Sequence, residues 1–218
     1  MSLLNKSTIK TAVVEDQREI REGLGMLIDA TEGYQCAGAY GSMEEALEGI
    51  DLNVPDIVLC DIGLPGMSGI EGIRILKERY PGLLLLTLSI YDDDERIFDA
   101  LCAGACGYLL KRTSRARLLD GINEAVTGGT PISPEVASRV LALFRDVCPP
   151  GRGVHELTPE AMRLLELLVE GHNYPTAAEE LNITHETVKL HMREIYHKLQ
   201  ALCKSEAVAP GPRERLFS

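Results

Sequence analysis

The sequence predicts an α/β domain with a five-stranded, parallel, doubly wound sheet, followed by a small all-α domain. Three observations support this fold class. Across residues 1–127, short apolar runs alternate five times with segments of helical periodicity, a pattern that specifies parallel strands joined by right-handed crossovers. The run Ile57–Cys60 has no period-two alternation, as expected of a strand buried on both faces. From residue 157 onward only helical patterns occur.

Apolar runs, capping residues and chain breakers place the individual elements of the first domain. The expected strands are 10–14, 34–40, 57–60, 83–89 and 107–110. The expected helices are 18–29, 42–50, 68–80 and 92–103, with a last helix that starts at Thr113 or Ser114 and fades at Gly128. Ser42 and Glu45 have the spacing of a capping box, which favours a helix start there.

Polar side chains follow four of these strands at the point where each strand ends. Glu15 and Asp16 follow the first strand, Asp61 the third, Ser89 the fourth and Lys111 the fifth. Because ligands bind at the carboxyl ends of strands in an open parallel sheet, we expect these side chains to meet at one edge. Three carboxylates repel one another unless a cation lies among them, and oxygen ligands of this kind suit Mg²⁺. A phosphoryl group carried on a carboxylate would satisfy the hydroxyl and the ammonium group as well.

The first domain also resembles a known family. Taken alone, an aspartate at the end of a strand is most simply explained as the start of a turn. Residues 8–127, however, resemble a bacterial response-regulator receiver domain, through Glu15-Asp16, Asp61 followed by Pro65-Gly66, Ser89 and the block 103–111. The resemblance implies a flavodoxin-like fold, with Asp61 as the acceptor of a phosphoryl group from a sensor histidine kinase.

The resemblance also implies a metal site beside the phosphoacceptor. It implies that Mg²⁺ is held by Asp16, by Asp61 and by the carbonyl group of Gly63. It further implies that Glu15 assists through a water molecule.

Three more residues receive roles from the resemblance. Ser89 is implied as the switch hydroxyl, and Lys111 as the cation that bridges to the phosphoryl group. Tyr108 is implied as the switch aromatic, with a plain core aromatic as the alternative. The family usually has a small residue after the switch hydroxyl, whereas this chain has Ile90. We therefore expect slower phosphoryl exchange with small donors than an Ile90→Ala variant would show.

Residues 128–156 are expected to form a linker that contains a short helix. Ser133 caps this helix, Pro134 takes its first position, and the helix runs to about Phe144. The proline- and glycine-rich residues 148–153 are expected to be a flexible or extended tether.

The second domain, residues 157–218, is expected to contain three helices. Thr158 caps a helix that ends at Gly171, a short helix covers 174–181, and Thr184 caps a third helix through Leu199. The third helix has one apolar stripe, formed by Val188, Met192, Ile195 and Leu199. Two helices joined by a short turn in this way are the layout of a helix-turn-helix DNA reader.

The opposite face of the third helix carries basic and polar residues, which on a lone helix most often contact only solvent. Residues 157–208, however, resemble the LuxR-type helix-turn-helix output domain, through 157–159, 168–171, 177–181, 187–189 and 198–199. The resemblance implies that Lys189, Leu190 and Arg193 face base edges in the major groove of double-stranded DNA. It implies that Thr184, Thr187 and Lys198 lie near phosphates.

Three departures from the family pattern bear on DNA affinity. Pro175-Thr176 stands where members usually have a lysine, and Gln200 stands where a glycine is usual. The segment 210–212 (Pro-Gly-Pro) is expected to stop the last helix after Ala209, where members usually continue with a dimerisation face. Each missing phosphate contact weakens binding. We therefore expect weak binding by the monomer and a dependence on homodimer formation.

Composition sets further bounds. The net charge is −11, and residues 1–127 hold 12 Lys and Arg against 21 Asp and Glu. There is no apolar run long enough to span a membrane and no signal peptide, so a cytoplasmic location and no membrane partner are expected.

The six cysteines are scattered. Cys102 and Cys106 are four apart without a second pair nearby, and we interpret them as small, wholly or partly buried residues rather than metal ligands.

These observations together predict a DNA-binding transcriptional response regulator of the NarL/FixJ group, switched by Mg²⁺-dependent phosphorylation of Asp61. The chain is not expected to be a dedicated enzyme, although the receiver would promote its own phosphoryl transfer and hydrolysis. The alternative is a phosphorylation-switched protein-interaction module with weak or no DNA binding, which the acidity of the second domain favours. A small flavodoxin-like enzyme is disfavoured because no substrate-pocket signal is present.

Overall fold

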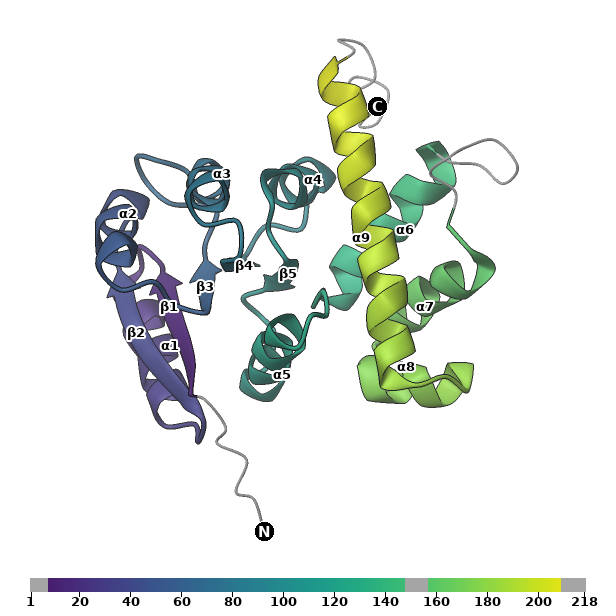
Figure 1. The fold of residues 1–218 in the computed structure, drawn as a ribbon, viewed down its shortest axis with the longest axis horizontal. Helices are drawn as coiled ribbons and strands as arrows, with labels where there is room; N and C mark the ends of the chain where they lie inside the picture. Colours follow the sequence, from purple (N-terminus) through teal and green to yellow (C-terminus); the bar gives the residue numbers. More distant parts are fainter. Residues whose placement is uncertain (1–7, 148–156, 209–218) are drawn as a thin grey trace. The chain divides into compact units, whose positions relative to one another are not determined.

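The computed structural model describes residues 8–147 and 157–208, without the side chains of 146–147 and 203–208. The tether expected at 148–153 and the break expected at 210–212 lie outside these residues. The chain divides into two compact units, one that runs to Ser89 and includes Ala103–Cys106, and one that comprises Ile90–Cys102 and the chain from Gly107 onward (Figure 1). This division runs through the domain that we expected at 1–127.

The sheet has the predicted architecture of five parallel strands. The strands are β1 (Ile9–Val14), β2 (Tyr34–Tyr40), β3 (Ile57–Cys60), β4 (Leu84–Ser89) and β5 (Gly107–Leu110), in the spatial order β2-β1-β3-β4-β5. This is the doubly wound order of flavodoxin-like folds, in which ligands bind at the carboxyl ends near the β1/β3 switch point. All four residues of β3 are buried, as the absence of alternation predicted.

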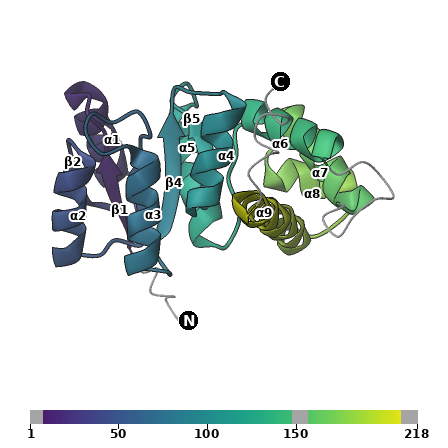
Figure 2. The same cartoon turned by 90° about the horizontal axis from the view of Figure 1, so that it is seen from above.

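Three helices belong to the first unit: α1 (Arg18–Asp29), α2 (Met43–Leu52) and α3 (Gly69–Arg79). α2 and α3 pack side by side on one face of β1–β3, and α1 lies on the other (Figure 2). The hydroxyl group of Ser42 accepts a hydrogen bond from the Glu45 amide, which confirms the predicted helix start. Glu45 reaches back to the amide of Gly41, at 2.9 Å, rather than to that of Ser42.

The second unit contains the remaining helices, apart from Ala103 at the end of α4, which belongs to the first unit. They are α4 (Asp94–Ala103), α5 (Arg115–Val126), α6 (Pro134–Val147), α7 (Pro159–Val169), α8 (Tyr174–Leu181) and α9 (His185–Val208). The expected caps at Ser114 and Thr158 both accept a backbone hydrogen bond. Among the described residues, no helix combines the length and the apolar character needed to cross a bilayer.

The third helix does not end where we expected. It was expected through Leu199, but it continues without interruption to Val208 as α9, one residue before the stop that was expected after Ala209. The apolar stripe continues as well, because Leu202 is buried together with Val188, Met192, Ile195 and Leu199. No glycine or proline lies between Leu199 and the end of α9, so no residue in that stretch stops the helix.

Packing of α7, α8 and α9 against one another forms the core of the helix-turn-helix part. Leu164, Leu168, Ala177 and Met192 are buried there. Asn182 joins α8 to α9 in the left-handed conformation, with φ of 52°. This single residue produces the short turn, because asparagine tolerates that conformation better than most side chains.

Candidate functional site

Three carboxylates lie together where β1 and β3 end. Val14 pairs with Cys60, and the Asp61 amide donates to the Val14 carbonyl oxygen at 3.0 Å. The two strands therefore end at the same level in the sheet, and the residues that follow them lie side by side. Carboxylate oxygens of Glu15, Asp16 and Asp61 all lie within 4.8 Å of one another. Glu15 and Asp61 are only 1% and 5% exposed, whereas Asp16 is exposed.

The donor set of this acidic cluster (Glu15, Asp16 and Asp61) fits a small, hard divalent cation. Carboxylate oxygens of few residues, with one side open to water, are the ligands that Mg²⁺ prefers. The negative field of the cluster also acts on a neighbour. Burial, helped by the charges of Asp61 and Glu15, raises the pKa of the Cys60 thiol well above its ordinary value.

Backbone contacts hold the phosphoacceptor candidate in place. The Gly63 amide donates to Asp61 Oδ1 at 3.1 Å, which sets the Gly63 backbone beside the carboxylate that we expect to share a metal with it. A Cβ on Gly69 would overlap the Asp61 carbonyl oxygen, so α3 can begin this close only with glycine there. Gly66 adopts a φ of +76°, and the adjacent Met67 amide donates to Glu44 at 3.0 Å.

Arg21 supports the other side of the cluster, and sequence reasoning missed it. Its guanidinium group donates to the carbonyl oxygens of Glu15 and Asp16, at 2.6 and 3.1 Å. The signal was present in the sequence, because a residue one turn into α1 can reach back to the loop before that helix. Gly69 was also missed, but for a different reason: its role depends on a close approach of α3 to the Asp61 carbonyl group that no spacing in the sequence reveals.

The remaining predicted site residues fall in different units. Ser89 is the last residue of β4, in the same unit as the acidic cluster, and its side chain is buried. Lys111 directly follows β5 in the second unit. Ile90 begins the second unit with its side chain 63% exposed.

Tyr108, the candidate switch aromatic, is completely buried and forms hydrogen bonds through both its side chain and its backbone. Its hydroxyl group donates to the Tyr91 carbonyl oxygen at 2.7 Å. The Arg96 guanidinium group lies over the Tyr91 ring, 4.0 Å from its centroid. Tyr108 therefore contacts the segment that follows Ser89 in the chain.

The linker pairs directly with the strand that carries Tyr108. The Tyr108 amide donates to the Pro131 carbonyl oxygen at 2.9 Å, and the Ser133 amide donates to the Tyr108 carbonyl oxygen at 3.1 Å. Ser133 Oγ also accepts from the Leu110 amide at 3.0 Å. Ser133, expected only as a helix cap, thus joins the start of α6 to β5.

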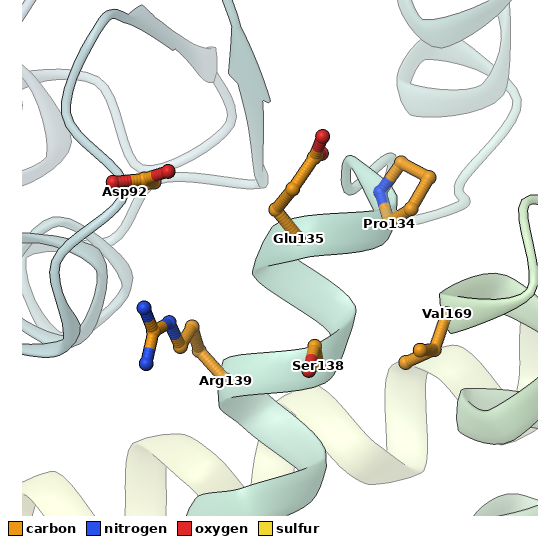
Figure 3. Close-up of a pocket in the computed structure, with 6 residues that line it drawn as sticks. All are labelled: Asp92, Pro134, Glu135, Ser138, Arg139 and Val169. Atoms are coloured by element: carbon orange, nitrogen blue, oxygen red, sulfur yellow. The ribbon is translucent and has the colours of Figure 1, made fainter.

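Ion pairs connect the same regions across a shallow cavity of about 420 Å³. Its lining consists of Asp92, Pro134, Glu135, Ser138, Arg139 and Val169. In Figure 3, Arg139 extends from α6 toward the segment of Asp92. Arg139 pairs with Asp94 at 3.3 Å, and Arg112 pairs with Asp92 and Glu135 at 3.6 and 2.9 Å. The charged residues that line the cavity are therefore paired with other side chains of the chain in this conformation.

The basic residues expected to read DNA are engaged within the chain. Lys189 is only 5% exposed and pairs with Glu186 at 2.9 Å, so the expectation of an outward-facing Lys189 is not met in this conformation. The Arg193 Nε donates to the Gly128 carbonyl oxygen at 2.7 Å. Lys198 pairs with Glu194 at 2.7 Å.

Other residues of the expected DNA surface are accessible. Leu190 is 61% exposed, an unusual position for a large apolar side chain. The hydroxyl groups of Thr184 and Thr187 lie 2.8 Å apart at the start of α9. Both kinds of side chain suit contact with a DNA groove or its phosphates.

Tyr174 fixes α8 to the segment after α5, a contact that sequence reasoning missed. Its buried hydroxyl group donates to the Thr130 carbonyl oxygen at 2.7 Å and accepts from the Thr130 amide at 3.0 Å. No sequence signal links residues 44 apart in this way. Together with the contact from Arg193 to Gly128, it holds α8 and α9 against residues 128–130.

Comparison with known proteins decides the family. Residues 11–123 match the family described as "Response regulator receiver domain", and residues 155–209 match "Bacterial regulatory proteins, luxR family". The chain is a two-component response regulator with a LuxR-type DNA-binding domain. Its five-stranded parallel sheet is the receiver fold of this family, and its C-terminal helices are the transcription-regulating part.

Full-length relatives support the family assignment of this response regulator. The "Transcriptional regulatory protein YdfI" of Bacillus subtilis is 31% identical over 199 residues, covering 91% of this chain and 93% of the relative. The "Nitrate/nitrite response regulator protein NarL" of Escherichia coli is 28% identical over 214 residues, covering 98% and 99%. Among solved structures, the response regulator ChrA of a heme-sensing two-component system has 28% identity and a TM-score of 0.53, covering 96% and 99%.

Proposed function

We propose that a sensor histidine kinase transfers a phosphoryl group to Asp61 of this response regulator, and that the phosphorylated form binds double-stranded DNA as a homodimer. The observation that carries the proposal is the acidic cluster, whose three carboxylates lie within 4.8 Å of one another. Two of them are almost completely buried, and a divalent cation among the three carboxylates would offset their mutual repulsion.

In the proposed transfer, an oxygen of the Asp61 carboxylate attacks the phosphorus atom, and the bond from phosphorus to the kinase histidine nitrogen breaks. Mg²⁺ held by Asp16, Asp61 and the Gly63 carbonyl group, with Glu15 nearby, would offset the negative charge of the carboxylates and of the phosphoryl group. The hydrogen bond from the Gly63 amide to Asp61 keeps the carboxylate oriented. Ser89 and Lys111 receive the phosphoryl oxygens in this proposal, and the same groups promote its later hydrolysis.

We propose that the switch passes through Tyr108 to the linker. Tyr108 is bonded to Tyr91 on one side and to Pro131 and Ser133 on the other. Phosphorylation that moves the segment after Ser89 therefore changes the hydrogen bonds of Tyr108 and shifts the population of two conformations.

In functional terms we divide the chain into a receiver at 1–127, a linker at 128–156 and a DNA-binding domain at 157–218.

The DNA-binding state that we propose differs from the conformation described above. Lys189 leaves Glu186 and Arg193 leaves Gly128, so that both cations, with Leu190, reach base edges in the major groove. Thr184, Thr187 and Lys198 contact phosphates. Two such helices in a dimer read half-sites in adjacent turns of the groove. Because the proposed ligand is double-stranded DNA that carries regulatory half-sites, we propose that the regulator acts in the cytoplasm.

A selection of genomic DNA fragments tests the proposal. The full-length protein is loaded with Mg²⁺ and beryllofluoride, a mimic of the phosphoryl group, and bound fragments are sequenced. We expect one enriched sequence with two related half-sites. Asp61→Asn, which loses the acceptor oxygen, is expected to enrich none, and Arg193→Ala is expected to enrich a less specific set. A protein that enriches no sequence in the loaded state, or an Asp61→Asn variant that selects as well as the native chain, would overturn the proposal.

A further inference from the structure

Arg21 of α1 is bonded to the loop that carries two of the three carboxylates. Its Nη1 nitrogen donates to the Glu15 carbonyl oxygen at 2.6 Å and to the Asp16 carbonyl oxygen at 3.1 Å. Both bonds end on backbone oxygens, so they orient the loop without using the carboxylate oxygens that bind a cation. Arg21 is partly buried, which limits the water that competes for these bonds.

The loop between β1 and α1 lacks the usual capping side chain. Gln17 occupies the N-cap position of α1, and its side chain makes no capping hydrogen bond. By contrast, the side chains of Ser42 and Ser68 cap α2 and α3. The Gln17 amide instead donates to the Glu15 carboxylate at 3.3 Å. The bonds from Arg21 therefore restrain a loop that its own N-cap side chain does not restrain.

Arg21 also contacts the loop between β2 and α2. A Cβ on Gly41 would lie 3.5 Å from Arg21 Nη1 and 3.4 Å from Glu45 Oε2, so both charged groups lie against the Gly41 backbone. The Gly41 amide donates to that Glu45 oxygen at 2.9 Å. The Glu15 amide donates to the Tyr40 carbonyl oxygen at 3.0 Å. Arg21 therefore connects the acidic loop to a neighbouring loop that has hydrogen bonds of its own.

The place of this guanidinium group is unfavourable on charge alone. Backbone amides give the start of a helix a partial positive charge, which favours anions there rather than cations. A guanidinium group beside a Mg²⁺ site also repels the metal ion. Loss of the charge by itself would therefore tighten Mg²⁺ binding, whereas loss of the two bonds to carbonyl oxygens would loosen the loop and weaken binding. Because the two effects have opposite signs, an experiment can separate them.

We propose that Arg21 is a positioning residue for phosphoryl transfer, which holds the backbone of residues 15–16 in the orientation that binds Mg²⁺ beside Asp61. Carboxylate oxygens of Glu15, Asp16 and Asp61 lie within 4.8 Å of one another, and Arg21 binds the carbonyl groups of two of these residues. The inference rests on the proposed function, because it names a residue that prepares the same site. Removal of a group that orients metal ligands typically lowers metal affinity about 10–100-fold.

Isothermal titration of the full-length, unphosphorylated chain with Mg²⁺ tests the proposal. Arg21→Met keeps an unbranched side chain but removes the donors, and we expect it to bind Mg²⁺ about tenfold more weakly than the native chain. Arg21→Lys should bind nearly as well as the native chain. Both bonds of Arg21 come from one nitrogen, and an ammonium group carries three donors. Unchanged or tighter Mg²⁺ binding by Arg21→Met would overturn the proposal.

Arg18→Met is the matched control, because it removes the same charge from the same helix. The Arg18 side chain is 74% exposed and pairs with Glu22 at 2.7 Å, one turn further along α1. We expect this variant to bind Mg²⁺ within about twofold of the native affinity, because salt screens exposed charges. If Arg18→Met weakens binding as much as Arg21→Met does, the positioning role is overturned.

The Mg²⁺ dependence of labelling by acetyl phosphate distinguishes positioning from a general loss of structure. We expect Arg21→Met to need about tenfold more Mg²⁺ for half-maximal labelling of Asp61. Its maximal rate should stay within about twofold of the native rate, because the bound metal ion then fixes the loop. A lower maximal rate with an unchanged Mg²⁺ requirement would overturn the proposal.

Urea denaturation shows whether each variant folds. If Arg21→Met does not fold, Arg21→Gln, which also removes the charge, replaces it in both measurements with the same expected result. Native protein that neither binds Mg²⁺ nor takes a label on Asp61 would overturn the proposed function and this inference together. Native protein that does both, with Arg21→Met equal to it, would overturn the positioning role alone.

Discussion

At the scale of single residues, Asp61 is constrained from three directions. The strand β3 is anchored to β1 through Val14, Gly63 donates to the carboxylate, and Gly69 allows α3 to begin against the Asp61 carbonyl group. The side chain is thereby fixed before any ligand arrives. Preorganisation of this kind lowers the cost of binding a cation or a phosphoryl group.

The first prediction concerns Asp16, the exposed member of the acidic cluster. We expect Asp16→Asn to weaken Mg²⁺ binding about 10–100-fold, because one carboxylate charge is lost from the site. Stability should change little, since the side chain is exposed. Isothermal titration with Mg²⁺ measures the affinity. Glu19→Gln, an exposed acid in the first turn of α1, is the control and should leave the affinity unchanged.

The second prediction concerns Gly69. A methyl group at this position overlaps the Asp61 carbonyl oxygen, so we expect Gly69→Ala to lower the free energy of unfolding by about 1–3 kcal/mol. Urea denaturation measures the loss. A Cβ on Gly82 meets no atom within 4 Å, so Gly82→Ala should be close to neutral. If the two variants are equally stable, the close approach at Gly69 is not a constraint on this loop.

At the scale of elements, the sequence predicts local structure well and long-range contacts poorly. The observed bounds of α1, β2 and α8 are those that periodicity and capping gave, because all their determining signals lie within the segments themselves. The continuation of the third helix past Leu199 was missed, because the residues between Leu199 and the break expected at 210–212 were not assigned to that helix. The burial of Lys189 and the bond from Tyr174 to Thr130 depend on segments far apart in sequence. The spacing of residues within one segment does not predict such contacts between distant segments.

Tyr174 provides the third prediction. Tyr174→Phe removes a buried hydroxyl group and leaves both polar groups of the Thr130 backbone without that partner. We expect a loss of about 1–3 kcal/mol in the free energy of unfolding and increased DNA binding without phosphorylation. Chemical denaturation and a DNA titration measure the two effects. Tyr80→Phe, whose hydroxyl group donates to Asp51 at the surface, should cost much less and leave DNA binding unchanged.

The fourth prediction is a pH dependence that arises from Glu124 on α5. Burial raises the pKa of this carboxyl group, despite its ion pair with Arg117 at 2.8 Å. The folded state therefore binds the proton more tightly than the unfolded state, so the carboxyl group contributes stability at low pH that is lost as pH rises through the raised pKa. Glu124→Gln mimics the protonated form. We expect the variant to be more stable than the native chain at neutral pH, and the difference to disappear below the ordinary glutamate pKa.

At the scale of the whole molecule, the proposed function requires two conformations of one chain. In the conformation described, Lys189 and Arg193 form contacts within the chain, and α8 and α9 are held against residues 128–130. Phosphorylation has to favour a second conformation in which these contacts are replaced by DNA. The two states need to differ by only a few kcal/mol for a single phosphoryl group to shift the balance.

The fifth prediction concerns assembly. We expect sedimentation velocity to show a monomer in the absence of a phosphoryl mimic and a dimer when Mg²⁺ and beryllofluoride are both present. DNA affinity should then depend steeply on protein concentration but only weakly on salt, because the domain offers few cations for phosphate contacts. Tight, strongly salt-dependent binding by the monomer would contradict this expectation.

The most direct test of the account is to locate the phosphoryl group. Native protein is incubated with acetyl phosphate, with and without Mg²⁺, and the labelled aspartate is identified by borohydride reduction and peptide sequencing. We predict one label, on Asp61, that requires Mg²⁺ and is absent in Asp61→Asn. A label on another residue, or equal labelling of Asp61 without any divalent cation, would contradict the account.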